Sequence, residues 1–199
     1  MGLASDYPIM LITGGSRGIG AATARLAARQ GYNIVFSYVT SESDAVAVAA
    51  DVEVAGRQAF AVNAIGPMLC AQQAAKRMAY RHGGQGGSVV NVSSIAAKLG
   101  SPNEYVDYAA SKGALETFTI GFAKEVAREG IRVNCVRPGH IYTDMHASGG
   151  EPGRVERLKD SIPMGRGGQP EEVARAILWL ASAEASFITG TFLDATGGK

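Results

Sequence analysis

The sequence has little of what a metal site, a membrane span or a nucleic-acid surface requires. It contains only 2 cysteines and 3 histidines, and His82, His140 and His146 form no cluster suited to a metal ion. Lysine and arginine number 19 against 18 acidic residues, without the basic block that a nucleic-acid partner would favour. No apolar run is long enough to span a bilayer, and no charged-then-apolar leader begins the chain. We therefore expect a cytoplasmic protein with neither nucleic-acid nor membrane partners.

The two cysteines are also too few and too far apart to suggest a disulfide framework or a zinc site. Cys70 and Cys135 lie in apolar stretches without metal-ligand spacing. Cysteines in such stretches are typically buried free thiols, which suits a reducing compartment.

Short apolar runs and helical patterns alternate along the chain. Strands are predicted at residues 7–13, 32–38, 57–62, 87–94, 131–139 and 189–198. Helices are predicted at residues 18–31, 42–56, from residue 63 onward, 107–128 and 170–181. This alternation predicts parallel crossovers and therefore an α/β fold with an open parallel sheet covered on both sides. Length and even composition favour one domain over residues 1–199.

A glycine-rich stretch, TGGSRGIG at residues 13–20, lies between the first predicted strand and the first predicted helix. Gly14, Gly18 and Gly20 would let the backbone pass close to a diphosphate, and the start of a helix offers free N–H groups to an anion. A glycine triplet alone is a weak signal, since it also occurs in merely tight turns. Its place between a strand and a helix favours a dinucleotide site.

A tyrosine and a lysine stand four residues apart in YAASK, so a helix would place Tyr108 and Lys112 on one face. An unperturbed tyrosine has a pKa of about 10, and a nearby ammonium would lower this pKa toward neutral pH. Tyr105 has no such partner, because Ala109 stands four residues on, and we expect it to be structural or to face the substrate. Taken alone, the pair could equally be an ordinary amphipathic pair.

Several motifs in this order resemble those of the short-chain dehydrogenase/reductase family, over essentially the whole chain. The members most resembled are 3-oxoacyl-ACP reductases and glucose 1-dehydrogenases. TGGSRGIG resembles the cofactor loop, NVSS the serine strand, YAASK the Y-x-x-x-K motif, RPGHIYT the P-G-x-I-x-T motif and FLDATGG the closing strand. The resemblance implies a Rossmann-like, doubly wound parallel sheet in a single domain. It also implies an oxidoreductase that transfers a hydride between a nicotinamide cofactor and a small carbonyl or alcohol substrate.

The resemblance implies four catalytic residues, which are Asn63, Ser94, Tyr108 and Lys112. In the family, the serine holds the substrate oxygen, the tyrosine passes the proton, and the lysine holds the ribose while lowering the pKa of the tyrosine. The asparagine supports a water and proton relay. Ser93 is the neighbouring hydroxyl, but alternation along a strand turns it to the opposite face, which favours Ser94.

The resemblance further implies the residues that contact the cofactor. They are Gly14, Ser16, Arg17, Gly18, Ile19, Gly20, Tyr38, Thr40, Tyr108, Lys112, Pro138, Gly139, Ile141 and Thr143. Ile141 would offer its backbone, and Thr143 its hydroxyl, to the nicotinamide carboxamide.

The choice between NAD and NADP depends on the end of the second strand. An acidic residue there would accept hydrogen bonds from the ribose hydroxyls and select NAD, but Tyr38 occupies this position and the nearest acid is Glu42. Arg17 could pair with the additional phosphate of NADP, unless it is a solvated loop charge. We therefore expect NADP rather than NAD.

The junction between the strand predicted at residues 57–62 and the helix predicted from Asn63 lacks turn residues. Family members place a further helix and a central strand here, ending in an N-N-A-G motif. This sequence has no such motif, and it lacks the acidic residue that usually follows the third strand. A crossover helix with its strand needs roughly 30–45 residues. One helix and one central strand are therefore absent between about Ala59 and Asn63.

Three explanations account for the absence: an omitted disordered segment, a real deletion, or a variant fold that closes the sheet differently. A real deletion would leave a slot about 4.8 Å wide in the sheet, with unpaired backbone groups, and should not fold stably. We therefore favour the omitted segment. It predicts that one Cα–Cα distance between Ala59 and Asn63 exceeds the roughly 3.8 Å of a bonded pair.

Other parts of the chain bear on substrate and assembly. The glycine-rich and polar stretch at residues 144–168 is typical of a mobile substrate lid, although nothing in it indicates which substrate binds. The helix at 107–128 has more apolar surface than one core-facing stripe requires, which predicts a homo-oligomer, expected to be a tetramer as is common in the family. The alternatives to an enzyme are a dinucleotide-sensing regulatory protein and an inactive product of a real deletion.

Overall fold

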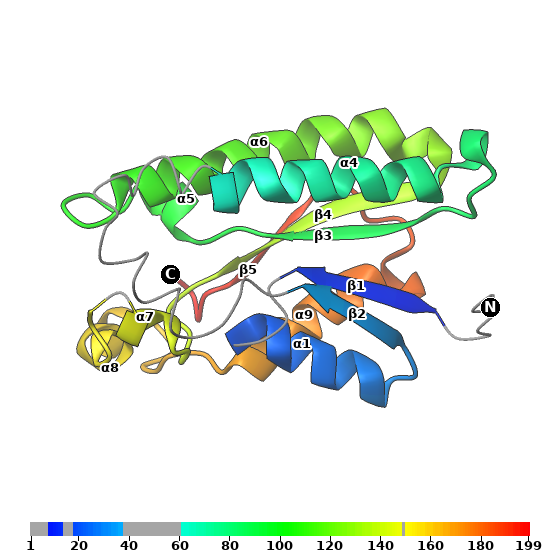
Figure 1. The fold of residues 1–199 in the computed structure, drawn as a ribbon. Coiled ribbons are helices and arrows are strands. Elements are labelled where there is room, and N and C mark those ends of the chain that lie inside the picture. Colours follow the sequence, from blue (N-terminus) through cyan, green and yellow to red (C-terminus); the bar gives the residue numbers. More distant parts are fainter. Residues whose placement is uncertain (1–7, 14–17, 38–60, 149) are drawn as a thin grey trace. The chain divides into compact units, whose positions relative to one another are not determined.

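The computed structural model covers residues 1–199, and we describe residues 8–13, 18–37, 61–148 and 150–199 (Figure 1). The strands are β1 (Ile9–Thr13), β2 (Asn33–Ser37), β3 (Gly87–Val92), β4 (Ile131–Pro138) and β5 (Phe192–Ala195). The longer helices are α1 (Gly18–Arg29), α4 (Gly66–Met78), α6 (Val106–Val126) and α9 (Pro170–Ala181). Shorter elements are the π-helix η1 (Ala61–Ile65), the helices α5 (Ala96–Leu99), α7 (Met145–Ser148) and α8 (Arg154–Leu158), and the 3₁₀ turns η2 (Tyr80–His82), η3 (Ala127–Glu129), η4 (Lys159–Ser161) and η5 (Ala183–Ala185).

Every strand pair among the described residues is parallel, as the alternation of strands and helices predicts. β1 pairs with β2, with Ile9 opposite Asn33. β3, β4 and β5 pair in that order, with Gly87 opposite Ile131 and Cys135 opposite Phe192. The predicted Rossmann-like α/β fold is thereby confirmed.

The chain divides into two compact units. The first, here called the β1–β2 unit, comprises Met1–Val52 and His140–Leu178. The second, here called the β3–β5 unit, comprises Glu53–Gly139 and Trp179–Lys199. Among the described residues the strands form two separate sheets, one in each unit. The prediction of one domain over residues 1–199 remains a prediction.

The core of the β3–β5 unit lies between its sheet and two helices, because α4 and α6 pack side by side on one face of that sheet (Figure 1). Small residues of α4 allow close contact with α6, where the rings of Phe118 and Phe122 stack with centroids 4.9 Å apart. The buried cluster comprises Ala71, Ala75, Ala79, Phe122, Ala123, Val126, Ile131 and Val133. This packing fixes α6, which carries most of the site described below, against β3 and β4.

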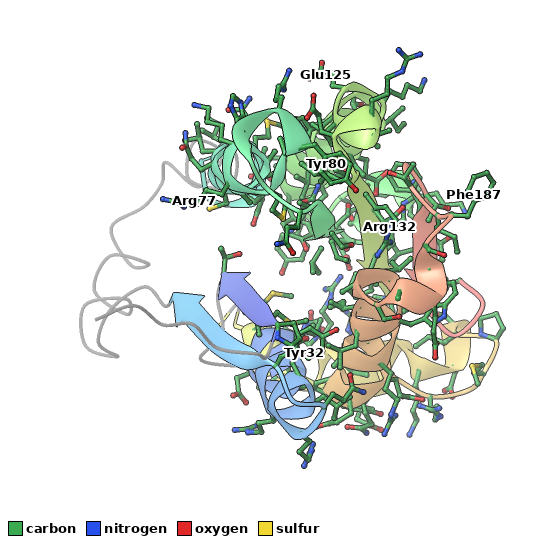
Figure 2. The ribbon with its side chains drawn as sticks, turned by 90° about the vertical axis from the view of Figure 1, so that its right-hand side faces the viewer. Tyr32, Arg77, Tyr80, Glu125, Arg132 and Phe187 are labelled. Carbon is green, nitrogen blue, oxygen red and sulfur yellow. The ribbon has the colours of Figure 1, made fainter. Side chains whose placement is uncertain are left out.

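Arg132 on β4 joins the sheet to the end of α9 (Figure 2). Its Nη1 atom donates to the carbonyl of Leu180 at 2.7 Å, and its Nη2 atom donates to those of Ala181 and Ser182 at 3.2 and 3.0 Å. The last carbonyls of a helix have no partner within the helix. The guanidinium therefore caps the C-terminus of α9.

The junction near Asn63 differs from the predicted one. Ala61 and Val62 belong to the π-helix η1, which runs directly into α4, so the helix begins before Asn63 and the prediction of a strand through residue 62 is wrong. Pro67 lacks an N–H group, and it removes one helical hydrogen bond where the wide turn passes into the α-helix. The helix predicted at 42–56, the remainder of the strand and the Ala59–Asn63 distance lie outside the described residues.

Other predictions correspond closely to the structure, with one error. The helices predicted at 170–181 and 107–128 are α9 and α6. The last strand is shorter than predicted, since only Phe192–Ala195 pairs with β4. Cys135 is buried, but Cys70 is exposed, so its predicted burial is wrong. The buried stripe of α4 runs through Ala71 and Ala75, and Cys70 lies beside it. No helix in the described part of the chain is long and apolar enough to cross a bilayer.

Candidate active site

The four residues predicted to be catalytic all belong to the β3–β5 unit. Asn63 lies in η1, Ser94 follows β3, and Tyr108 and Lys112 lie one turn apart on α6. The packing of η1 against α6, together with hydrogen bonds of Thr119 and Lys112 of α6 with β3, brings these separate segments to one place.

The hydroxyl of Ser94 lies close enough to the phenol of Tyr108 to affect its pKa. Burial raises the pKa of Tyr108, while the interaction with Ser94 lowers it by a smaller amount. The expectation of a lowered pKa is therefore wrong for this structure, because removing the phenolate from water outweighs the effects that stabilise it. A phenol with a raised pKa keeps its proton at neutral pH and can donate it.

Lys112 lies close to this phenol, with its Nζ atom 5.7 Å from the centre of the Tyr108 ring. Its ammonium donates to the carbonyl of Val92 at 2.9 Å. Burial lowers the pKa of Lys112 to about 8, against a smaller opposing effect of Cys135. A buried ammonium that donates to a backbone carbonyl is poorly solvated, so its charge acts strongly on nearby groups.

The Val92 carbonyl is available to Lys112 because of how β3 pairs. The N–H groups of Gly87 and Ser93 donate to the carbonyls of Gly130 and Val136, so the alternate backbone groups of β3, Val92 among them, point away from β4. β3 is the edge of its sheet among the described residues. The ammonium of Lys112 thus donates a hydrogen bond to the Val92 carbonyl, to which a further strand would otherwise donate.

Asn63 joins the cluster through the backbone of α6. Its Nδ2 atom donates to the hydroxyl of Ser111 at 3.4 Å, and this hydroxyl donates to the carbonyl of Tyr108 at 2.7 Å. The amide of Asn63 is thereby held on the helical turn that contains both Tyr108 and Lys112.

Ser93 and Ser94 have different partners, as expected of neighbouring residues that follow a strand. Ser94 contacts Tyr108, and its Oγ atom accepts from the N–H of Ala96 at 3.1 Å. Ser93 is buried, and its hydroxyl donates to Glu116 Oε1 at 2.7 Å. The geometry places Ser94, not Ser93, next to the phenol.

Glu116 and its partner Arg137 are residues of this cluster that the sequence reasoning missed. Glu116 stands one turn after Lys112 on α6, and Arg137 lies near the end of β4. The spacing of four residues between Lys112 and Glu116 was a usable signal, because it places both on one helix face. Nothing in the sequence pairs Glu116 with a strand residue that far along the chain.

The residues predicted to contact a cofactor lie in both units. In the β1–β2 unit, Gly18, Ile19 and Gly20 form the first turn of α1. Gly18 has a φ of 52°, and a Cβ atom there would lie 3.3 Å from the methyl group of Thr143. Thr143, which is predicted to contact the nicotinamide carboxamide, therefore lies beside the start of α1. Ile141 forms a parallel bridge with Gly168.

In the β3–β5 unit, Pro138 ends β4 and its carbonyl accepts from the N–H of Ile95 at 2.9 Å. A Cβ atom on Gly139 would lie 2.8 Å from the Cα atom of Thr196, so only glycine fits. The remaining predicted contacts, Gly14, Ser16, Arg17, Tyr38 and Thr40, lie outside the described residues.

A pocket of about 290 Å³ lies within the stretch predicted to be a substrate lid. It is lined by Asp144, His146, Pro152 and Val155 of this stretch, and by Tyr142 and Thr143, which precede it. The hydroxyl of Tyr142 donates to Glu156 Oε1 at 2.6 Å, which ties the start of this stretch to α8. Among the residues with described positions, no group of histidine, cysteine and carboxylate side chains could hold a metal ion.

Two family models match the chain. Residues 8–62 match the model described as short chain dehydrogenase, and residues 53–199 match the model described as enoyl-(acyl carrier protein) reductase. The chain belongs to the short-chain dehydrogenase/reductase family. The resemblance that the motifs indicate is thereby confirmed, and the protein is an oxidoreductase of a family that generally binds NAD(P).

Relatives in this family are similar over almost the whole chain. The uncharacterized oxidoreductase YgfF of Escherichia coli K12 is 48% identical, with 96% of this chain and 99% of the relative covered. The human 3-oxoacyl-[acyl-carrier-protein] reductase is 36% identical, with 96% and 97% covered. The crystal structure of acetoin dehydrogenase YohF from Salmonella typhimurium superimposes with a TM-score of 0.77 at 28% identity, and 96% of each chain is covered.

The match with YgfF also concerns the junction near Asn63. It runs over 245 aligned positions although this chain has 199 residues, so the relative contains residues that have no counterpart here. The two family-model matches meet at residues 53–62, next to the predicted absence. These findings support a longer segment in relatives, and they leave the three explanations of its absence open.

Proposed function

We propose that this protein catalyses NADP-dependent transfer of a hydride between the nicotinamide and the carbonyl or alcohol carbon of a small substrate. The observation that carries the proposal is the group formed by Tyr108, Ser94 and Lys112: a protonated phenol, a hydroxyl close to it, and a buried ammonium on the same helix face. This is the set of groups that a carbonyl needs as it becomes an alkoxide and then an alcohol.

Each side chain has a role that follows from its surroundings. Ser94 donates a hydrogen bond to the substrate oxygen and holds it next to Tyr108. Tyr108, whose phenol is protonated at neutral pH, transfers its proton to that oxygen as negative charge develops. Lys112 stabilises the phenolate that remains. Asn63 is bonded through Ser111 to the turn of α6 that carries Tyr108, and it supports the relay that returns a proton to the phenolate.

A nicotinamide cofactor, when bound, supplies the hydride. The start of α1 suits such a group, because Gly18 has a φ of 52°, which glycine adopts without strain, and the first turn of a helix offers free N–H groups to a diphosphate. Gly18, Ile19 and Gly20 would face the diphosphate, and Ile141 and Thr143 the carboxamide. Arg17 and Tyr38 support NADP over NAD, as the sequence indicates.

The exposed apolar residues of η1, α4 and α6 support a homo-oligomer. Ile65 and Leu69 lie one turn apart and are 53% and 54% exposed, and Val106 and Ile120 on α6 are 60% and 40% exposed. Such surface on adjacent helices favours burial against a second copy of the chain.

The alternatives are a dinucleotide-sensing regulatory protein and, if the deletion is real, an inactive product. An activity assay distinguishes the enzyme from these alternatives. The purified protein is mixed with NADPH or NADH and with simple aldehydes, ketones, β-keto esters or diketones. The absorbance of the reduced nicotinamide then reports turnover. Oxidation of NADPH that Tyr108→Phe abolishes supports the enzyme. Cofactor binding without turnover of any carbonyl would support a dinucleotide sensor, and the lack of both binding and turnover an inactive product.

A further inference from the structure

Glu116 and Arg137 form a buried ion pair directly behind the serine and lysine of the site. Arg137 Nε donates to Glu116 Oε1 and Arg137 Nη2 to Glu116 Oε2, both at 2.7 Å. The two side chains are only 12% and 17% exposed. Such a bidentate pair is both strong and geometrically specific.

The same carboxylate also holds the turn that bears the catalytic serine. Glu116 Oε1 accepts from the hydroxyl of Ser93 at 2.7 Å, and this hydroxyl lies 3.4 Å from the carbonyl of Lys112. Ser93 is the residue next to Ser94, so orienting one fixes the backbone that presents the other. Through Glu116, the end of β3, the end of β4 and the Lys112 turn of α6 are joined at one point.

Arg137 is itself oriented on its other side. Its Nη1 atom donates to Asp194 Oδ1 at 3.2 Å, and its guanidinium lies 4.2 Å from the centre of the Phe192 ring on β5. Asp194 also pairs with Lys98 near the surface. The network therefore has a buried half, at Glu116 and Ser93, and a more exposed half, at Asp194 and Lys98.

We propose that Glu116 and Arg137 are positioning residues, which act through Ser93 to hold Ser94 next to Tyr108. This inference rests on the proposed function for its consequence in catalysis. A buried ion pair is weak evidence for stability alone, because the cost of desolvating both charges can exceed their attraction. Its fork geometry and its third bond to Ser93 are better explained by orientation.

The first test does not require activity. Tyrosine labelled at the ζ carbon reports ionisation by NMR, and Tyr108→Phe assigns the Tyr108 signal. Since the interaction with Ser94 lowers the pKa of Tyr108, its loss in Glu116→Gln or Ser93→Ala should raise this pKa relative to that of the wild type. Lys98→Met, at the exposed end of the network, is the matched control and should leave the signal in place.

The second test is kinetic. Glu116→Gln and Ser93→Ala should lower kcat by about 10- to 100-fold while the dissociation constant of NADPH changes less than about 3-fold, because cofactor contacts remain and only the reacting geometry is lost. Arg137→Lys, which keeps the charge but not the fork, should behave like Glu116→Gln.

The outcomes separate the two proposals. An unchanged Tyr108 titration in folded Glu116→Gln and Ser93→Ala would overturn the positioning proposal, whether or not the wild type turns over a substrate. Lower thermal stability with unchanged kcat in these variants would likewise show a merely structural pair. A wild type without turnover, combined with the shifted Tyr108 titration, would contradict the proposed function and leave the positioning intact.

Discussion

Lys112 should make the stability of the protein depend on pH in a way that its substitution removes. Burial lowers the pKa of Lys112 from 10.5 to about 8. At pH values below about 8 the lysine is charged in both the folded and the unfolded chain, and folding carries the cost of burying the charge. Between about 8 and 10.5 the folded chain has released the proton that the unfolded chain still binds, so the free energy of unfolding rises with pH in this window.

The size of this rise follows from the change in pKa. One pKa unit corresponds to 1.36 kcal/mol, so moving the pKa from 10.5 to about 8 corresponds to about 3 kcal/mol. Lys112→Met keeps much of the side-chain volume and has no proton to release. Relative to this variant, the wild type should therefore gain about 3 kcal/mol of stability across the window.

The assay is urea unfolding of both proteins at neutral pH and at several values up to pH 10.5. Comparing wild type with variant cancels the titration of groups that they share. Lys124→Met removes an exposed lysine from the same helix, and it controls for the loss of a positive charge in general. If the wild type and Lys112→Met differed by the same free energy at every pH, the reasoning about burial would be wrong.

Three further expectations follow. Arg17→Ala should weaken NADPH binding by about 10- to 100-fold, because a guanidinium–phosphate hydrogen bond is charge-assisted, and it should leave NADH binding unchanged. An equal loss of affinity for NADPH and NADH, measured by titration with each cofactor, would refute the role of Arg17. Light scattering at micromolar concentration should give the mass of a homo-oligomer, expected to be a tetramer, and a monomer would contradict this. Arg132→Ala should destabilise the protein by about 2 kcal/mol in urea unfolding, since it leaves the last carbonyls of α9 without their charged donor, whereas Arg128→Ala at an exposed position should change little.

Much of the fold was predictable because the signals are local. α9 is an example: Pro170 opens it with a preset φ, and Glu171 and Glu172 lie in its first turn, where the helix dipole favours acidic residues. The strands β3 and β4 were predictable from continuous apolar runs. Four-residue spacing was also enough to place Tyr108 and Lys112 on one face of α6.

What was not predictable depends on burial and on contacts between distant residues. The sequence shows that a lysine stands near Tyr108, but not that desolvation outweighs the neighbouring effects and raises the pKa. The pairing of Glu116 with Arg137 and Ser93 depends on how α6 lies over β3 and β4, which no local pattern encodes. The exposure of Cys70 depends on the angle at which α4 meets the sheet, and small residues on both sides of a helix leave that angle open.

The most direct test of the account is the comparison of Tyr108→Phe with Tyr105→Phe in NADPH-dependent carbonyl reduction. Tyr108→Phe keeps the ring and removes the hydroxyl that Ser94 contacts, so kcat should fall by about 10²–10⁴ with cofactor binding largely intact. Tyr105 precedes α6 and is 42% exposed, and its substitution should have a much smaller effect on kcat. Abolished turnover in Tyr105→Phe, together with normal turnover in Tyr108→Phe, would contradict the assignment of the site.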